Sequence, residues 1–301
     1  KYGNRAVMYT KLKRKVVTCI QYVLHRIFRV VLSPLNTVLG EREKYLLWEI
    51  WKGSFLHRLP DTRLEHFECS VFSQNGEDGI IAEIFRRIGT DTKTFIEIGV
   101  EVGKQCNTRL LLMDDWKGLW IEGNEEYCAK IYDNCREYID NKQLTVKNAF
   151  VTRANIDLLI ADYMRGDIDL LSIDIDGNDY YVLSEIQAVT PRVIITEYNA
   201  NFPPPYRFVI AYDDKFIWKG DDYYGASLSA FYDLLVVRGN YELVGCDFTG
   251  TNAFWVRRDL TGELFPYEKT AEKLFNRAKY SFSLTGHPAS FRNFLNLNGR
   301  H

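Results

Sequence analysis

Residues 170–183, LLSIDIDGNDYYVL, decide the fold, because an apolar run typical of a strand ends in acids. The run predicts a strand at 168–175, with Asp174 and Asp176 at its end and Asp179 just past a glycine. Ionised carboxylates are costly to bury unless something pairs with them. Either the strand ends at the surface, or its acids hold a cation, a proton or a substrate.

Around this stretch, strand and helix patterns alternate. Strands are expected at 94–99, 118–122, 144–149, 168–175 and 192–197, and helices at 79–88, 107–114, 125–138, 156–164 and 180–186. Such units predict a parallel sheet covered by helices on both faces. A helix at 227–238 then precedes strands at 241–247 and 252–257, joined by a hairpin-like turn. We therefore predict an α/β, Rossmann-like fold of the class I methyltransferase kind, with a mainly parallel seven-stranded sheet that ends in an antiparallel hairpin.

Charge is distributed unevenly along the chain. Residues 1–40 contain eight Lys or Arg and no Asp or Glu, so the remainder carries 30 of the 38 basic residues and all 40 acidic ones. An acidic body argues against a nucleic-acid enzyme, whose working face is normally basic. Six cysteines without a CxxC pair argue against a zinc site or a disulfide framework and favour a reducing, cytoplasmic setting.

The N-terminal part predicts a basic helical extension at 1–60. A helical apolar stripe at 16–32 is interrupted by polar and charged residues too often to span a membrane, and a second helical stretch follows at 41–55. We expect residues 11–32 to dock on the body or on a second subunit, or to lie on an anionic membrane surface.

A nucleoside site is predicted at the ends of the first two strands. In FIEIGVEVGKQCNT, residues 95–108, Gly99 and Gly103 follow Glu97, and the next strand ends in Glu122, where a carboxylate can accept both ribose hydroxyls. The spacing is GxxxG, so the pyrophosphate-binding GxGxxG fingerprint is missing. This spacing and the terminal hairpin favour S-adenosylmethionine (SAM) over NAD.

Two further segments are candidates to border the cofactor. The SQNGEDG stretch either caps the first helix or contributes Ser73, Gln74 and Asp78 to the site. The third strand ends in Asn148, Ala149 and Phe150, where the adenine would lie.

Five motifs together resemble the FkbM-like family of SAM-dependent methyltransferases over residues 70–258. They are SQNGEDGII, FIEIGVEVG, WIEGN, SIDIDGNDYYVL and NAFWVRR. The resemblance implies a SAM-dependent methyltransferase domain, which we expect at 61–260. The tail at 261–301 lies outside the resemblance, and we expect it to pack on or near the domain. It also implies O-methylation, often of sugar hydroxyls, and places Glu97 near the methionine end of SAM. Val100-Glu101-Val102 departs from the small residues usual in the family.

Methyl transfer to a hydroxyl requires alignment and the removal of one proton. Neighbouring strand ends supply Asp174 and Asp176, and Glu197 and Asn199, whose hard oxygen atoms suit Mg²⁺ or Mn²⁺. Three interpretations stay open: a carboxylate base without a metal, a divalent metal that lowers the pKa of the hydroxyl, or a structural role for most of these acids. Asp174 is also a candidate to contact the cofactor, and Gly177 is expected to permit the sharp turn after the strand.

The region after the fifth strand is expected to form the acceptor pocket. NANFPPPY, residues 199–206, predicts a stiff wall, and Trp218, Tyr223 and Tyr224 follow in a loop whose rings could stack on a sugar. The sequence thus favours an enzyme, a SAM-dependent O-methyltransferase acting on a sugar or surface glycan in the cytoplasm, free or at the inner face of a membrane. The alternatives are an NAD(P)-dependent oxidoreductase and a non-catalytic Rossmann-like scaffold in glycan assembly.

Overall fold

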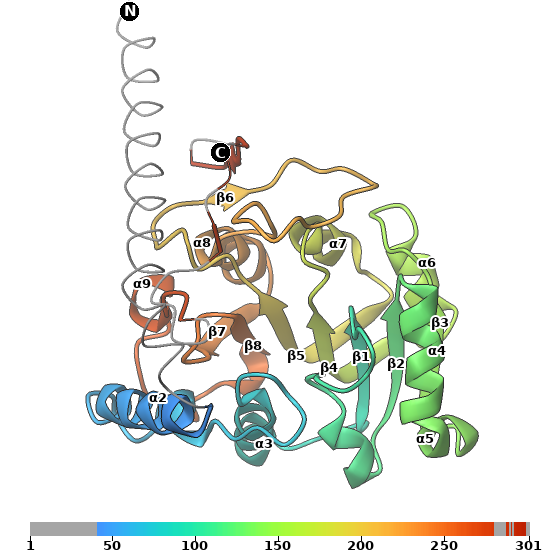
Figure 1. Ribbon diagram of the computed structural model, residues 1–301, viewed down its shortest axis with the longest axis horizontal. Helices are drawn as coiled ribbons and strands as arrows, with labels where there is room; N and C mark the ends of the chain where they lie inside the picture. The colour runs from blue at the N-terminus through green and yellow to red at the C-terminus, as the bar shows by residue number, and fades with distance from the viewer. Residues whose placement is uncertain (1–40, 280–286, 289, 291, 299–301) are drawn as a thin grey trace, which may run out of the picture.

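The computed structural model describes residues 41–279, 287, 288, 290 and 292–298 (Figure 1). The helix predicted at 16–32, and the membrane or subunit contacts expected of residues 11–32, lie outside these ranges. Within the described ranges, every helix is too short or too polar to cross a membrane.

A single seven-stranded sheet organises the chain (Figure 1). Its order is β3-β2-β1-β4-β5-β8-β7. The first five strands are parallel, and β8 runs antiparallel to both β5 and β7. The predicted Rossmann-like fold, with its antiparallel hairpin, is confirmed. The strands are β1 (Thr94–Ile98), β2 (Lys117–Glu122), β3 (Leu144–Asn148), β4 (Gly166–Ile173), β5 (Val189–Glu197), β7 (Tyr241–Cys246) and β8 (Asn252–Arg257).

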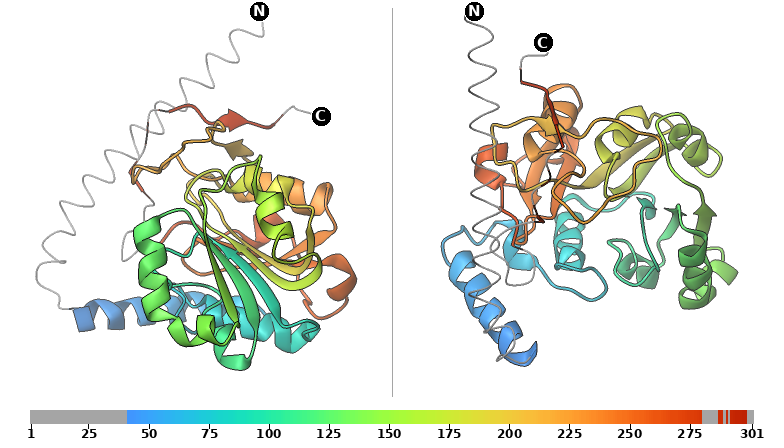
Figure 2. Two further views of the ribbon diagram at one scale, coloured as in Figure 1. Left: turned by 90° about the vertical axis from the view of Figure 1, so that its right-hand side faces the viewer. Right: turned by 45° about the horizontal axis from the view of Figure 1, so that its top comes forward.

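Helices cover both faces of the sheet (Figure 2). One face packs against α3 (Glu77–Ile88) and α4 (Glu125–Asn134). The other packs against α6 (Ile156–Ala161), α7 (Asp179–Glu185) and α8 (Leu228–Tyr232). Successive side chains of a strand point to opposite faces, so in β4 Leu170 enters the first core and Leu171 the second. This is why the central strands are apolar at nearly every position.

Several predicted helices are shorter or broken. The segment predicted at 107–114 contains only the 3-10 helix η2 (Leu110–Asp114), because the preceding turn is held by the Glu97 carboxylate. The helix predicted at 125–138 divides at Cys135 into α4 and α5 (Arg136–Asp140). The helix predicted at 227–238 continues from α8 as the π-helix η3 (Asp233–Val237).

Two peripheral segments pack on this core. Helix α2 (Glu41–Leu56) places Trp48, Trp51 and Phe55 around Phe248 in the β7–β8 turn, with ring centroids 5.0 to 5.4 Å apart. The short 3-10 helix η1 (Leu64–Phe67) lies between α2 and α3, and the 3-10 helix η4 (Arg258–Leu260) directly follows β8. In the C-terminal part, α9 (Ala271–Leu274) packs on the second core, and β9 (Leu295–Asn296) pairs antiparallel with β6 (Phe208–Val209).

Candidate active site

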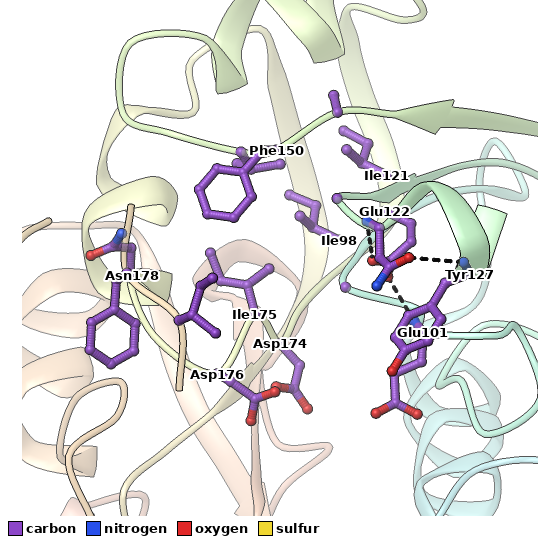
Figure 3. A pocket seen from close by; sticks show the side chains of 17 residues that line it. Ile98, Glu101, Ile121, Glu122, Tyr127, Phe150, Asp174, Ile175, Asp176 and Asn178 are labelled. Carbon is purple, nitrogen blue, oxygen red and sulfur yellow. Dashed lines mark hydrogen bonds between the residues drawn. The ribbon is translucent and has the colours of Figure 1, made fainter. Parts of the chain in front are cut away.

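A cavity of about 440 Å³ lies at the carboxyl ends of β1, β2, β3 and β4. Its volume falls in the range of small-ligand sites, and this edge is where open α/β sheets bind ligands. Four of its lining residues are carboxylic acids, Glu101, Glu122, Asp174 and Asp176, and none of the described lining residues is Lys, Arg or His. Figure 3 shows Glu101, Asp174 and Asp176 with their carboxylates on one side, and Phe150 on the other. The cavity therefore favours a cationic ligand over an anionic one.

Glu122 joins the turn after β1 to the end of β2. One carboxylate oxygen accepts hydrogen bonds from the backbone N–H groups of Val100, at 3.2 Å, and Glu101, at 2.9 Å. The other accepts from Asn124 N–H at 2.8 Å (Figure 3). A carboxylate has about four acceptor sites, so Glu122 can still accept from a ligand hydroxyl. Glu122 lines the cavity, and its contact with a nucleoside stays a prediction.

Glu97 lies behind the cavity and holds the turn that shapes it. Its carboxylate accepts from the backbone N–H groups of Asn107, at 2.8 Å, and Thr108, at 3.0 Å, and from the Thr108 hydroxyl. Desolvation raises the pKa of Glu97 to about 7 even though these hydrogen bonds favour the charged form. Glu97 is buried and does not line the cavity.

The two predicted glycines have different surroundings. Gly99 lines the cavity at φ 81°, and a Cβ there would lie 1.7 Å from the carbonyl oxygen of Asp174. Gly103 adopts φ 69°, but a Cβ there would contact the Trp120 ring and the Ile131 side chain. Gly103 thus allows core packing, whereas Gly99 allows the turn after β1 to approach the end of β4.

The SQNGEDG stretch forms a capped turn. One oxygen of Asp78 accepts from the backbone N–H groups of Val71, Phe72 and Ser73, and Asp78 N–H donates to the Ser73 hydroxyl at 3.0 Å. Ser73 and Asp78 are buried, Gln74 is exposed, and none of the three is in the cavity lining. The Ser73 hydroxyl thus satisfies one amide in the first turn of α3, whereas the Asp78 carboxylate holds the turn before the helix and the N-cap residue is Gly76.

The end of β3 contributes apolar surface. Ala149 and Phe150 line the cavity, and the placement of an adenine beside them stays a prediction. Phe150 is 49% exposed, which is unusual for a large apolar side chain and leaves its ring available to a ligand. Asn148 turns away and donates to the Glu122 carbonyl oxygen at 3.1 Å.

Three predicted catalytic acids come together beside the cavity. One carboxylate oxygen from each of Asp174, Asp176 and Glu197 lies within 4.8 Å of the other two. Desolvation and repulsion from neighbouring acids of the cluster raise the pKa values of Asp174 and Glu197 well above their ordinary range. Desolvation and the charges of Asp179 and Glu101 raise the pKa of Asp176 to about 6. Glu197 is buried, and its Oε2 has no hydrogen-bond partner among the described residues. The cluster suits a bound cation or a shared proton.

Asp179 shapes the loop that carries two of these acids. Its two oxygens accept from the backbone N–H groups of Ile175 and Gly177, both at 2.8 Å. Asp176 makes the sharp turn with φ 54°, a left-handed conformation that is costly for a residue with a Cβ. The expectation that Gly177 makes this turn is wrong, since its φ is not positive; a Cβ there would instead lie 2.4 Å from the Phe216 ring.

The side chain of Asn199 is occupied by hydrogen bonds to nearby loop residues. Its side-chain N–H₂ donates to the carbonyl oxygens of Asp222, at 2.8 Å, and Tyr224, at 3.0 Å. Its side-chain oxygen accepts from Asn201. Asn199 thus anchors the loop at 221–224 and has no oxygen free for a metal.

The aromatic residues predicted for the acceptor pocket do not line this cavity. Tyr223 and Tyr224 are buried, and Trp218 packs edge-on against His287 with centroids 4.6 Å apart. Phe216 and Ile217 line the cavity instead. Phe216 and Ile217 thus form one wall of the cavity. Two adjacent apolar residues inside a polar loop were the only feature of the sequence that could have predicted it.

The sequence did not predict several other residues that line the cavity. Glu101, Tyr127 and Asn178 were not predicted as site residues, although they line the cavity. Glu101 adopts φ 48°, so a second acid with a left-handed backbone faces the site. Its signal was the departure of Val100-Glu101-Val102 from the family pattern.

No protein-family model matches the chain, and neither does any curated protein. Similar solved structures include a protein described as a caffeoyl-CoA O-methyltransferase from Staphylococcus aureus, 12% identical, covering 76% of this chain and 98% of that one, with a TM-score of 0.42. The N-terminal domain of EvdMO1 with S-adenosylhomocysteine (SAH) bound is 13% identical, covers 62% and 82%, and has a TM-score of 0.40. An O-methyltransferase from Bacillus cereus in complex with SAH is 13% identical, covers 79% and 97%, and has a TM-score of 0.39. Likeness at this level assigns no activity or residue role, and the FkbM-like resemblance stays a prediction.

Proposed function

We propose that this protein is a SAM-dependent methyltransferase that transfers a methyl group to a hydroxyl on a sugar or surface glycan. The observation that carries the proposal is the acid-lined cavity at the carboxyl edge of the sheet, whose lining contains no basic residue in the part of the chain that the structure describes. SAM carries a sulfonium and an ammonium group, which acidic walls attract. The phosphates of NAD(P) would be repelled, and their usual glycine-rich cradle is missing. The oxidoreductase alternative is therefore disfavoured.

Different residues of the cavity suit different parts of SAM. Glu122 can accept from one ribose hydroxyl, because three of its about four acceptor sites are already filled. Ile98, Ile121 and Phe150 offer apolar surface to the adenine (Figure 3). Glu101 and Asp174 lie on the other side of the cavity, where charged groups would be attracted. Bound SAM would supply an electrophilic methyl group.

Asp176 is the proposed proton acceptor. It lines the cavity, and desolvation and neighbouring acids raise its pKa to about 6, close to neutral pH, where general bases act efficiently. As the new C–O bond forms and the methyl–sulfur bond breaks, the hydroxyl proton passes to the Asp176 carboxylate. Asp179 and Glu101 add negative charge near Asp176, which strengthens its attraction for the proton.

A divalent cation is the second version of the same proposal. The buried, unpartnered Oε2 of Glu197 and the close approach of three carboxylate oxygens fit a hard cation such as Mg²⁺ or Mn²⁺. Asp174, Asp176 and Glu197 would hold it. When bound, it would lower the pKa of an acceptor hydroxyl. Activity that survives EDTA would leave only the carboxylate base.

Calorimetric titration with SAM and with NAD(P) tests the cofactor. We expect SAM to bind; binding of NAD(P) without SAM would overturn the proposal, and binding of neither would favour the scaffold. Incubation of glycan acceptors with isotope-labelled SAM, followed by mass analysis of the product, then tests the reaction. Transfer to nitrogen or carbon in place of oxygen would refute the O-methyltransferase assignment.

The setting of the enzyme is part of the proposal. A reducing, cytoplasmic environment is consistent with Cys106, Cys128, Cys135 and Cys246, which are free and buried. Contact of residues 11–32 with a membrane surface or a second subunit, and the limits of the three expected parts of the chain, remain predictions.

A further inference from the structure

The wall formed by Phe216 and Ile217 is attached differently from the rest of the cavity. Every other lining residue belongs to one of the strands β1 to β4 or to the turn and helix that directly follow it. Phe216 and Ile217 come from the long loop between β6 and α8. The position of this wall therefore depends on contacts made by the loop itself.

The first half of the loop is held beside α7. The side chain of Asn178 donates to the carbonyl oxygen of Asp213 at 2.8 Å. The Phe216 ring occupies the space left by the missing Cβ of Gly177. Ile217, in contrast, is 73% exposed, so little besides its neighbours in the loop restrains it.

The second half is clamped by the C-terminal segment through Arg292. Its guanidinium forms hydrogen bonds of 2.7 and 2.8 Å to the two carboxylate oxygens of Asp221. The same group lies 4.1 Å from the centre of the Tyr223 ring and 5.8 Å from that of Phe216. One side chain thus contacts both ends of the segment that carries the wall.

The C-terminal segment is itself fixed in place. Strand β9 pairs with β6, and Phe294 packs on Tyr223 with ring centroids 4.8 Å apart. Ser290 N–H donates to the Asp222 carboxylate at 2.6 Å. Arg292 is therefore presented to the loop from an anchored backbone, which gives its contacts a defined direction.

We propose that Arg292 is a positioning residue that holds the Phe216–Ile217 wall against the cavity and thereby slows the release of the bound nucleoside. The identity of that ligand as SAM rests on the proposed function. Opening of the wall would require Arg292 to leave Asp221 and Tyr223, so dissociation is affected more than association.

The test compares four full-length proteins: wild type, Arg292→Ala, Arg292→Lys and the control Arg87→Ala. Arg87 also combines an ion pair, to Glu83, with stacking, on Phe67 and Phe265, but it lies in the last turn of α3, away from the cavity. Surface plasmon resonance gives the association and dissociation rates of SAM. Limited trypsin digestion at Lys215 and Lys219, which are exposed in the loop, reports on the wall without ligand.

We expect SAM to dissociate about fivefold to tenfold faster from Arg292→Ala than from wild type, with a nearly unchanged association rate. Arg292→Lys should fall between them, because lysine keeps the charge but loses the planar group that lies over the Tyr223 ring. Trypsin should cleave the loop faster in Arg292→Ala, while Arg87→Ala should match wild type in both assays even where its melting temperature falls.

Unchanged dissociation and unchanged cleavage in Arg292→Ala would overturn the inference. If Arg292→Ala does not fold, Arg292→Lys and Asp221→Asn carry the same comparison. If wild type does not bind SAM, the proposed function fails, whereas the trypsin comparison still decides whether Arg292 holds the wall.

Discussion

Replacing Asp176 by asparagine is expected to stabilise the fold while removing the proposed proton acceptor. The pKa of Asp176 rises from 3.8 to about 6 through desolvation and the charges of Asp179 and Glu101. This difference corresponds to about 3 kcal/mol between the charged and neutral forms, which partial exposure of the side chain reduces to about 1–2 kcal/mol. For a chain of this size, that gain raises the melting temperature by roughly 2–8 °C.

The sign of the pH dependence follows from linkage. A carboxyl whose pKa is raised in the folded state destabilises the fold when it is ionised. The free energy of unfolding of wild type therefore falls as the pH rises from 3.8 through about 6. Asp176→Asn should therefore be more stable than wild type at pH 8, and the difference should shrink as the pH falls toward 4. Asparagine also tolerates the left-handed backbone better, which adds a gain that does not vary with pH.

Thermal unfolding across this pH range, with methyl transfer measured in parallel, checks the prediction. Turnover should fall by about 10²–10⁴-fold, the usual contribution of a general base, while SAM still binds. Asp133→Asn is the control, because the Asp133 side chain is 79% exposed. A variant that is less stable at pH 8, or equally shifted at every pH, would refute the electrostatic reasoning.

Three further outcomes are expected. Gly177→Ala should destabilise the fold by about 1–3 kcal/mol and weaken SAM binding, because the new Cβ would lie 2.4 Å from the Phe216 ring; unchanged denaturant unfolding would contradict this. Glu122→Gln should weaken SAM binding by about 10–100-fold through lost charge-assisted hydrogen bonds, as measured by calorimetry, and wild-type affinity would exclude a ribose contact. Millimolar Mg²⁺ should raise the melting temperature more at pH 8 than at pH 5.5, since protons compete for acids with raised pKa values. Glu197→Gln should lose that difference, and an equal effect at both pH values would argue against the metal.

The sheet was largely predictable because its signal is local. Strand β8 matches its predicted bounds of 252–257, and the other strands agree within a few residues. Strand β4 ends at Ile173 and not at Ile175, because the Asp179 carboxylate takes the N–H groups of Ile175 and Gly177. The spacing of apolar residues in the sequence does not reveal a side chain that competes for backbone N–H groups.

The acids of the site were predictable for a similar reason, since a carboxylate that ends an apolar strand is visible in the sequence. The cavity wall was not. Phe216 owes its position to Gly177 and Arg292, and Arg292 meets Asp221 across 71 residues of chain. Such contacts depend on how the C-terminal segment returns to the loop, and no local pattern encodes that path.

Gly99 has a consequence for redesign of the proposed active site. The Asp174 N–H donates to the Ile98 carbonyl oxygen, and the Asp174 carbonyl oxygen occupies the place where a side chain at 99 would begin. The proposed methyl-donor half and the proton-accepting half of the site are therefore joined by one backbone contact, between residues 98–99 and Asp174. Substitutions that retune the acceptor half by shifting Asp174 will also displace the donor half, so the two halves must be engineered together.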